Sequence, residues 1–314
     1  MGLAGGFADG FTSPDVVADA LREVGYLADE SVAAAAFLAL RLNRPLFCEG
    51  EPGTGKTALA QSLSKALDCP LIRLQCHEGI DASAALYDWD FPRQLMHLRA
   101  VEAAGAVNGE RLDSSAVESS LYSERFLLAR PILKALQTSP SVLLIDEIDR
   151  ADDEFEAFLL EVLTDYTISI PELGEFIAQR PPIVILTSNR TREVHDALKR
   201  RCLYLWLDHP DAVRQVEILR SALPEVSERL TRDVAAAVTR LRSAGLIKPP
   251  GTAEALDWAQ ALHVIGSTTL DLNSATATMG AALKYREDAE TALQTLREWL
   301  FADVAQGYEP SAIS

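Results

Sequence analysis

The sequence contains only four cysteines, and no two of them have the C-x-x-C spacing of a zinc or redox motif. We therefore predict that Cys48, Cys69, Cys76 and Cys202 are reduced, mostly structural thiols of a cytosolic protein. Cys76 is followed by His77, which would supply half of a metal site, but the sequence offers no second half.

Long apolar segments are also missing. The longest apolar run, Val32 to Leu40, is too short to span a bilayer. The stretch from Met1 to Phe11 lacks the basic residues that begin a signal peptide, and it lacks the hydroxyl residue of a myristoylation motif. We therefore expect a cytoplasmic protein with no membrane span.

Basic residues are scarce: 29 Lys and Arg stand against 46 Asp and Glu, which gives a net charge of −17. Non-specific binding to nucleic acid needs a cationic face, so this balance argues against it, although a local basic patch remains possible. With 314 residues, of which 48 % are hydrophobic, the chain can form an ordinary core and more than one folding unit.

The most informative stretch is a P-loop motif. A short apolar strand beginning at Leu46 leads into Gly50 to Thr57, which has the form G-x-x-x-x-G-K-[ST], and a helical pattern follows. Glycines allow the backbone N–H groups to point at phosphate oxygens, and the helix that begins near Lys56 directs its positive end to the same place. A chance glycine-rich turn is the alternative, but the strand before the motif and the helix after it favour the P-loop.

This motif predicts a set of nucleotide-binding residues. Lys56 is expected to reach the β- and γ-phosphates, and the Thr57 hydroxyl is expected to bind Mg²⁺ together with Asp146. The full predicted set is Gly50, Glu51, Pro52, Gly53, Thr54, Gly55, Lys56, Thr57, Ala58 and Asp146.

A second apolar strand, from Val142, ends in Asp146 and Glu147. Acids at the carboxyl end of a buried parallel strand are typical of nucleotide-binding sheets. Asp146 is expected to hold Mg²⁺ through water, and Glu147 to orient and deprotonate the attacking water. Alternatively, both acids are solvated and cap the following helix.

Two further segments complete the predicted catalytic set of Lys56, Glu147, Asn189, Arg200 and Arg201. Asn189 ends the strand from Ile183 and is expected to bind the γ-phosphate or the water; otherwise it caps a helix. The cluster from Lys199 to Arg201, expected beyond a short helix, offers a finger arginine, for which we favour Arg201 over Arg200; a solvated basic cluster is the alternative. Because no N-K-x-D or T-K-x-D string is present, ATP is preferred to GTP.

The coarse pattern divides the chain into a helical lead-in (1–44), an α/β core (45–208) and a helical lid (209–314). Helices are expected from Pro14, from about Asp29 to Asn43, and from Arg130, and a strand over 70–74. In the lid we expect helices over 212–223, 227–244, 253–265, 274–283 and 287–301.

Three segments of the core are less regular. Tyr87 to Phe91 alternates aromatic rings with carboxylates, which fits either a strand with one buried face or an exposed loop that grips a partner. Gly105 to Ser120 is small and polar and is predicted to be a mobile loop. Thr167 to Ile170 and Glu175 to Ala178 are predicted to form a hairpin.

The order of these motifs resembles the AAA+ ATPases, and more closely the MoxR family. The matching strings are G-E-P-G-T-G-K-T (Gly50 to Thr57), L-L-I-D-E-I-D-R-A (Leu143 to Ala151), T-S-N-R-T-R-E (Thr187 to Glu193) and A-L-K-R-R-C (Ala197 to Cys202). The segment around Tyr87 and the hairpin before Ile183 are similar to two insertions of that clade. Within the family, the sequence is most similar to CoxD-type members linked to carbon monoxide dehydrogenase maturation.

The resemblance implies an α/β fold in which a P-loop AAA+ core with a parallel sheet is flanked by helices and followed by a helical lid. It also implies a homo-oligomeric ring, commonly a hexamer, that binds ATP and Mg²⁺ between subunits and receives the finger arginine from a neighbour. Such proteins remodel or activate a client, often a metalloenzyme, with a partner that carries a von Willebrand A domain. One departure is that Pro250 to Ala255, where many AAA+ lids carry a second sensor arginine, contains no Arg.

Two other functions remain open from the sequence. One is a nucleic-acid motor or loader on the same core, which would need a basic track on the ring. The other is an ATP-binding assembly switch that hydrolyses ATP only weakly.

Overall fold

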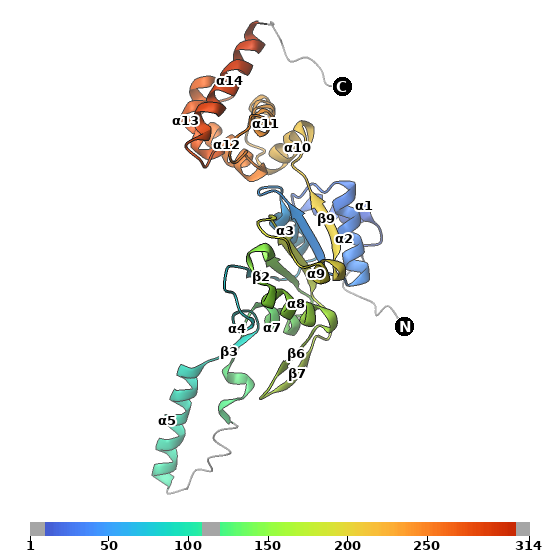
Figure 1. Ribbon diagram of the computed structural model, residues 1–314, viewed down its shortest axis with the longest axis vertical. Coiled ribbons are helices and arrows are strands. Elements are labelled where there is room, and N and C mark those ends of the chain that lie inside the picture. The colour runs from blue at the N-terminus through green and yellow to red at the C-terminus, as the bar shows by residue number, and fades with distance from the viewer. Residues whose placement is uncertain (1–9, 109–119, 306–314) are drawn as a thin grey trace. The chain divides into compact units, whose positions relative to one another are not determined.

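The computed structural model describes residues 10–108 and 120–305. The chain forms two compact units. The first comprises residues 1–20, 28–49 and 57–206, and the second comprises residues 21–27, 50–56 and 207–314. Figure 1 labels many of the elements of both units.

The first unit contains a five-stranded sheet (Figure 1). Its order is β2-β5-β8-β1-β9, and the β2/β5, β5/β8 and β1/β8 pairs are parallel. The strands are β1 (Leu46–Gly50), β2 (Leu71–Gln75), β5 (Val142–Asp146), β8 (Ile183–Ser188) and β9 (Leu203–Leu207). Every residue of β1 and β5 is buried, as expected for continuous apolar strands covered on both faces.

Helices connect these strands. The connecting helices are α3 (Lys56–Ala66), α7 (Pro131–Gln137), α8 (Asp153–Asp165) and α9 (Asp196–Arg201), and two helices, α1 (Pro14–Glu23) and α2 (Glu30–Leu42), precede β1. Acidic residues start several of them: the Asp29 side chain accepts the Val32 N–H of α2, and Asp152 accepts the Phe155 N–H of α8. The α/β P-loop fold predicted from the sequence is confirmed.

The segment between β2 and α7 forms a small substructure. It consists of α4 (Ala82–Ala85), β3 (Tyr87–Trp89), α5 (Phe91–Asn108), the 3₁₀ turn η1 (Glu124–Phe126) and β4 (Leu127–Ala129). β3 pairs antiparallel with β4, its Asp88 is exposed and its Trp89 is buried. Of the two alternatives for this stretch, the strand with one buried face is therefore correct for Tyr87–Trp89.

The predicted mobile loop needs a correction. Residues 105–108 belong to α5, because the helix that runs through Ala103 and Ala104 continues past Gly105 and ends only at Asn108. Residues 109–119 of the predicted loop lie outside the described residues.

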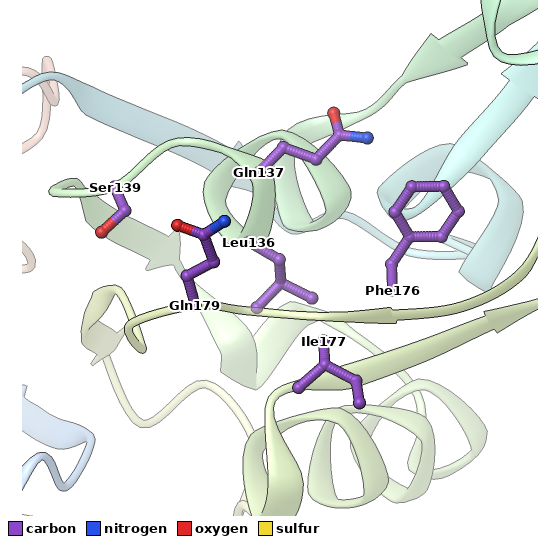
Figure 2. A pocket seen from close by; sticks show the side chains of 6 residues that line it. All are labelled: Leu136, Gln137, Ser139, Phe176, Ile177 and Gln179. Atoms are coloured by element: carbon purple, nitrogen blue, oxygen red, sulfur yellow. The ribbon is translucent and has the colours of Figure 1, made fainter.

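The predicted hairpin is confirmed as β6 (Thr167–Ile170) paired antiparallel with β7 (Gly174–Ile177). A cavity of about 280 Å³ lies where β7 meets the end of α7 (Figure 2). It is lined by Leu136, Gln137, Ser139, Phe176, Ile177 and Gln179. None of these side chains titrates or carries charge, so this cavity is a poor candidate for a catalytic site.

Between residues 207 and 305, the described part of the lid segment forms five helices where the sequence predicts them: α10 (Ala212–Ala222), α11 (Glu228–Arg242), α12 (Thr252–Val264), α13 (Leu272–Ala282) and α14 (Asp288–Ala305). Trp258 is fully buried in their core, and its indole N–H donates to the Thr278 hydroxyl across 2.8 Å. In the part of the chain that the structure describes, no helix combines the length and hydropathy required to cross a bilayer.

Candidate nucleotide site

Asp146 is the centre of a hydrogen-bond network at the carboxyl end of β5. Its Oδ1 accepts the Thr187 hydroxyl at 2.5 Å and the Thr57 hydroxyl at 3.0 Å. Asp146 is 3 % exposed and Thr187 is 1 % exposed, so these bonds are shielded from water. The structure thus brings together Thr57 and Asp146, which the sequence predicts as the Mg²⁺ site.

Glu147 follows with an unusual backbone conformation. Its φ is +56°, in the left-handed region that residues other than glycine rarely occupy. Its N–H donates to the Thr187 hydroxyl at 2.9 Å, and its carboxylate accepts from Gln75 at 3.1 Å. Its side chain is one-third exposed, so the group predicted to be a general base is fixed by the backbone and still open to water.

Asn189 lies directly after β8, the strand between β5 and β1. Its N–H donates to Oδ2 of Asp149 at 3.2 Å, and that oxygen also accepts the Thr191 N–H at 2.8 Å. Asp149 is 2 % exposed, and its Oδ1 has no hydrogen-bond partner. A buried carboxylate therefore fixes the loop that carries Asn189.

Negative charge is dense in this region. Burial, reinforced by Asp146, Asp149 and Glu147, raises the pKa of the Cys76 thiol to about 12. Such a field favours a bound cation. In the described segments no three His, Cys, Asp or Glu side chains form a metal cluster. The Asp146 carboxylate and the Thr57 hydroxyl are too few ligands for a site made by protein alone. They fit Mg²⁺, because this ion keeps several of its waters and also binds substrate phosphates.

The predicted finger arginines have a different position from that expected. Lys199, Arg200 and Arg201 form the last turn of α9 and do not lie beyond it, because the helix continues to Arg201. Both arginines are exposed. The Arg44 guanidinium binds the carbonyl oxygens of Arg200 (2.9 Å), Arg201 (3.2 Å) and Cys202 (3.2 Å), which fixes this end of the helix.

In the second unit, residues 50–56 form the predicted phosphate-binding loop. Gly53 and Gly55 have φ of +80° and +94°, which only glycine adopts without strain. The Lys56 ammonium is buried and donates to the carbonyls of Gly50 (2.7 Å) and Glu51 (2.6 Å). The loop is therefore folded around the ammonium group of its own lysine.

The start of lid helix α12 contacts this loop. The Thr252 N–H donates to the Gly53 carbonyl at 2.9 Å. Arg242, from the end of α11, donates to the carbonyls of Pro250 (2.9 Å) and Pro210 (3.0 Å). Burial lowers the Arg242 pKa to about 10, an effect that Glu254 and Glu51 oppose. Arg242 therefore fixes the lid segment that touches the phosphate-binding loop.

His209 also contacts the loop. Its Nε2 lies 3.1 Å from Oε2 of Glu51, and its Nδ1 is buried without a hydrogen-bond partner. Burial and then Arg242 lower the His209 pKa, against the opposing effect of Glu51. A neutral imidazole that donates from Nε2 to Glu51 satisfies both observations, so we assign this contact as a hydrogen bond instead of an ion pair.

Sequence reasoning missed several residues of the site: Arg73 and Gln75 on β2, Thr187 on β8, Asp149, and Arg44. Alternate positions of β2 carry Arg73 and Gln75, so both side chains lie on one face of the strand. That alternation is visible in the sequence. Their partners are not, because they depend on β2 pairing with β5.

The family description "AAA domain (dynein-related subfamily)" matches residues 45–202. An uncharacterized protein of Staphylococcus haemolyticus is 27 % identical over 207 residues, which cover 64 % of this chain and 67 % of the relative. An uncharacterized protein of Staphylococcus aureus is 28 % identical over 193 residues, which cover 59 % of this chain and 62 % of that relative.

Among solved structures, the RuvB Holliday junction branch migration motor of Thermotoga maritima is 16 % identical with a TM-score of 0.46 and covers 94 % of this chain and 80 % of that one. A mutant of the same motor is 17 % identical with a TM-score of 0.49, and the match covers 89 % of this chain and 81 % of the mutant chain. The family match spans half of the chain and contains the strands β1, β5 and β8 that carry the site. This chain therefore belongs to the AAA domain family, in its dynein-related subfamily, and has the P-loop fold of that family.

Proposed function

We propose that this protein is a Mg²⁺-dependent ATPase that assembles into a ring and remodels a client protein. The observation that carries the proposal is the network in which Thr57, Asp146 and Thr187 share hydrogen bonds and Thr187 also fixes the backbone of Glu147. The network joins Thr57, which follows the proposed phosphate-binding Lys56, to Asp146 and Glu147, the two acids proposed to act in hydrolysis.

The loop Gly50 to Thr57 is proposed to bind the phosphates of ATP. Lys56 would exchange the carbonyls of Gly50 and Glu51 for phosphate oxygens, which are stronger acceptors because they are charged. The N-terminus of α3, which starts at Lys56, adds its partial positive charge. The remaining members of the predicted set, from Glu51 to Ala58, would supply backbone contacts.

Thr57 and Asp146 are the proposed holders of Mg²⁺. When bound, Mg²⁺ neutralises the charge that develops on the phosphate oxygens. Thr187 keeps the Asp146 carboxylate in one orientation through its hydroxyl. A carboxylate that is already oriented loses little entropy when it binds a cation.

Glu147 is the proposed general base. The attacking water would give a proton to the Glu147 carboxylate while its oxygen bonds to the γ-phosphorus and the bond to the β–γ bridging oxygen breaks. Gln75 and Arg150, at 3.1 and 3.3 Å from Oε2 of Glu147, would release this carboxylate as it turns to the water. Asn189, with its backbone fixed by Asp149, would orient the water or the γ-phosphate.

A neighbouring subunit would supply the finger. Arg200 and Arg201 are exposed on α9, and Arg44 fixes the backbone beneath them. An arginine added from a second copy is worth about 10³ to 10⁵ in rate, so hydrolysis would require assembly. We favour Arg201 and a hexamer, as the MoxR resemblance implies.

The client would be a protein, approached together with a partner that carries a von Willebrand A domain. The MoxR resemblance, most similar to the CoxD type, suggests maturation of a metalloenzyme. Two elements of the first unit expose apolar side chains that suit protein contacts: Phe91 and Met96 of α5 are 61 % and 71 % exposed, and Ile177 of β7 is 66 % exposed. The net charge of −17 favours a protein over a nucleic-acid client.

Calorimetry with ATP and MgCl₂ tests the nucleotide site. Wild type should bind, Lys56→Ala should bind far more weakly, and Lys65→Ala, in the last turn of α3, is the control. Light scattering tests assembly, with a larger mass expected when ATP and Mg²⁺ are present. Equal binding by wild type and Lys56→Ala would refute the nucleotide site, and a monomer under all conditions would refute the finger from a neighbour.

A further inference from the structure

Arg73 forms an ion pair with the acid proposed to hold Mg²⁺. Its Nη2 lies 2.5 Å from Oδ2 of Asp146, and the same nitrogen lies 2.5 Å from Oε1 of Gln75. The two strands are in register here, with Gln75 opposite Asp146 and Arg73 opposite Leu144. Parallel pairing of β2 with β5 therefore directs the guanidinium to this carboxylate.

The contacts of the two Asp146 oxygens differ. Oδ1 accepts the two hydroxyls, from Thr187 and Thr57. Oδ2 faces Arg73, with the Thr57 hydroxyl farther away at 3.4 Å. Hydroxyl groups carry no net charge, and a buried carboxylate is costly unless it is paired. Arg73 thus supplies the positive charge that balances Asp146.

The exposure of the pair is unequal. The Asp146 side chain is 4 % exposed, whereas that of Arg73 is 50 % exposed. Asp146 is fixed by its buried hydroxyl partners, but the guanidinium can turn towards water and be solvated there at little cost. Glu147 has its own arginine, Arg150 at 3.3 Å, so each of the two acids is balanced separately.

We propose that Arg73 is the counter-ion of Asp146 in the absence of Mg²⁺ and that Mg²⁺ must displace it to bind. Both cations would be attracted to the one Asp146 carboxylate, so they would compete, and the strength of the Arg73–Asp146 pair would set the Mg²⁺ concentration at which the site fills. Arg73 is a positioning residue in this account, because it acts on Mg²⁺ only through the charge of the Asp146 carboxylate. The inference rests on the proposed ATPase site.

Mg²⁺-dependent binding of a fluorescent nucleotide tests this without measuring hydrolysis. The probe is ADP with a methylanthraniloyl label, added in EDTA and then titrated with MgCl₂. Removing a competing charge from a half-exposed position should lower the Mg²⁺ midpoint of Arg73→Ala about three- to tenfold. Arg73→Gln keeps most of the side-chain length without the charge and should lower the Mg²⁺ midpoint in the same way. It replaces Arg73→Ala in the test if that variant folds poorly.

Two control variants sharpen the comparison. Arg73→Lys retains the charge and should keep the midpoint within about twofold of wild type, since a competing cation remains. Arg130→Ala removes an exposed arginine that pairs with Asp88 at 3.2 Å, outside the Asp146 network, and should leave the midpoint unchanged.

Thermal denaturation adds a readout that a simple surface role would not change. In EDTA, Arg73→Ala should melt at a lower temperature than wild type, because Asp146 loses its balancing charge, and Mg²⁺ with ADP should reduce the difference. Arg130→Ala should show no such Mg²⁺-dependent recovery.

The outcomes separate this inference from the ATPase proposal. If wild type binds the probe with a Mg²⁺ midpoint but Arg73→Ala and Arg73→Gln have the same or a higher midpoint, competition is refuted while the ATPase proposal stands. If wild type does not bind the probe at any Mg²⁺ concentration, both are refuted.

Discussion

The hydroxyl of Thr57 donates to Oδ1 of Asp146 across 3.0 Å, which joins the first turn of α3 to the end of β5. The P-loop motif ends at Thr57, and Asp146 is the last residue of the apolar strand β5. Side chains from α3 and β5 are therefore directly connected within the first unit. This contact is the basis of the first prediction.

Thr57→Ala should weaken Mg²⁺-dependent nucleotide binding by about ten- to hundredfold, as is typical when a group that orients a metal ligand is lost. Thr57→Ser keeps the hydroxyl and should bind nearly as wild type does. Calorimetry in MgCl₂ and in EDTA measures both. A similar loss in the two variants would show that the methyl group matters and the hydroxyl does not.

Thr187→Val should destabilise the first unit by about 2 to 4 kcal/mol, because it removes a buried hydrogen bond to a carboxylate and the partner of the Glu147 N–H without changing the side-chain shape. Thr187→Ser restores both bonds and is the matched control. Urea denaturation measures the difference. Equal midpoints for wild type and Thr187→Val would contradict the assigned role of the hydroxyl.

Gly251→Ala tests the contact between the lid segment and the phosphate-binding loop. A Cβ there would lie 2.8 Å from Gly53 Cα and 2.9 Å from Oε2 of Glu254, so the backbone must shift at a cost of about 1 to 3 kcal/mol. Gly280→Ala, in α13, meets nothing within 4 Å and should stabilise by up to about 1 kcal/mol. Thermal denaturation compares the two, and an unchanged Gly251→Ala would contradict the close approach.

His209 should make stability depend on pH. Its pKa is lowered from 6.5 in the folded protein, mainly by burial. As the pH falls below 6.5, the unfolded chain binds a proton at this residue that the folded chain does not, so this contribution is present above that pH and is lost below it. His209→Gln should therefore lose less stability than wild type between pH 7.5 and pH 5.5.

His263→Gln is the control, because His263 is exposed and the substitution is the same. The measurement is the unfolding midpoint of wild type and of both variants at pH 7.5 and at pH 5.5. If His209→Gln and His263→Gln respond to acid as wild type does, the folded-state pKa of His209 is not lowered.

Much of this fold was predictable because its signals are local. The apolar runs from Leu46, Val142 and Ile183 indicated three strands, and Pro14 and Asp29 indicated helix starts. Strand β9, directly after the basic end of α9, was missed although Leu203 to Leu207 is apolar. Helix α8 was also missed, even though Asp152 is a regular N-cap for it.

The candidate site was predictable where it follows from a motif, as for Lys56, Thr57 and Asp146. The roles of Arg73 and Thr187 depend on which strands are neighbours: β2 and β8 flank β5, and that order is not contained in any one segment. The turn at Glu147 was also hidden, because a positive φ at a glutamate has no sequence signal.

Phosphate release by wild type and by Glu147→Gln, measured with ATP binding on the same samples, tests the central claim most directly. Glutamine keeps the size of the side chain but cannot take the proton from water. The account predicts Mg²⁺-dependent release by wild type, and for Glu147→Gln unchanged ATP binding with release reduced by a factor of about 10² or more. Normal release by Glu147→Gln would contradict the account, because the base would then have to be another group.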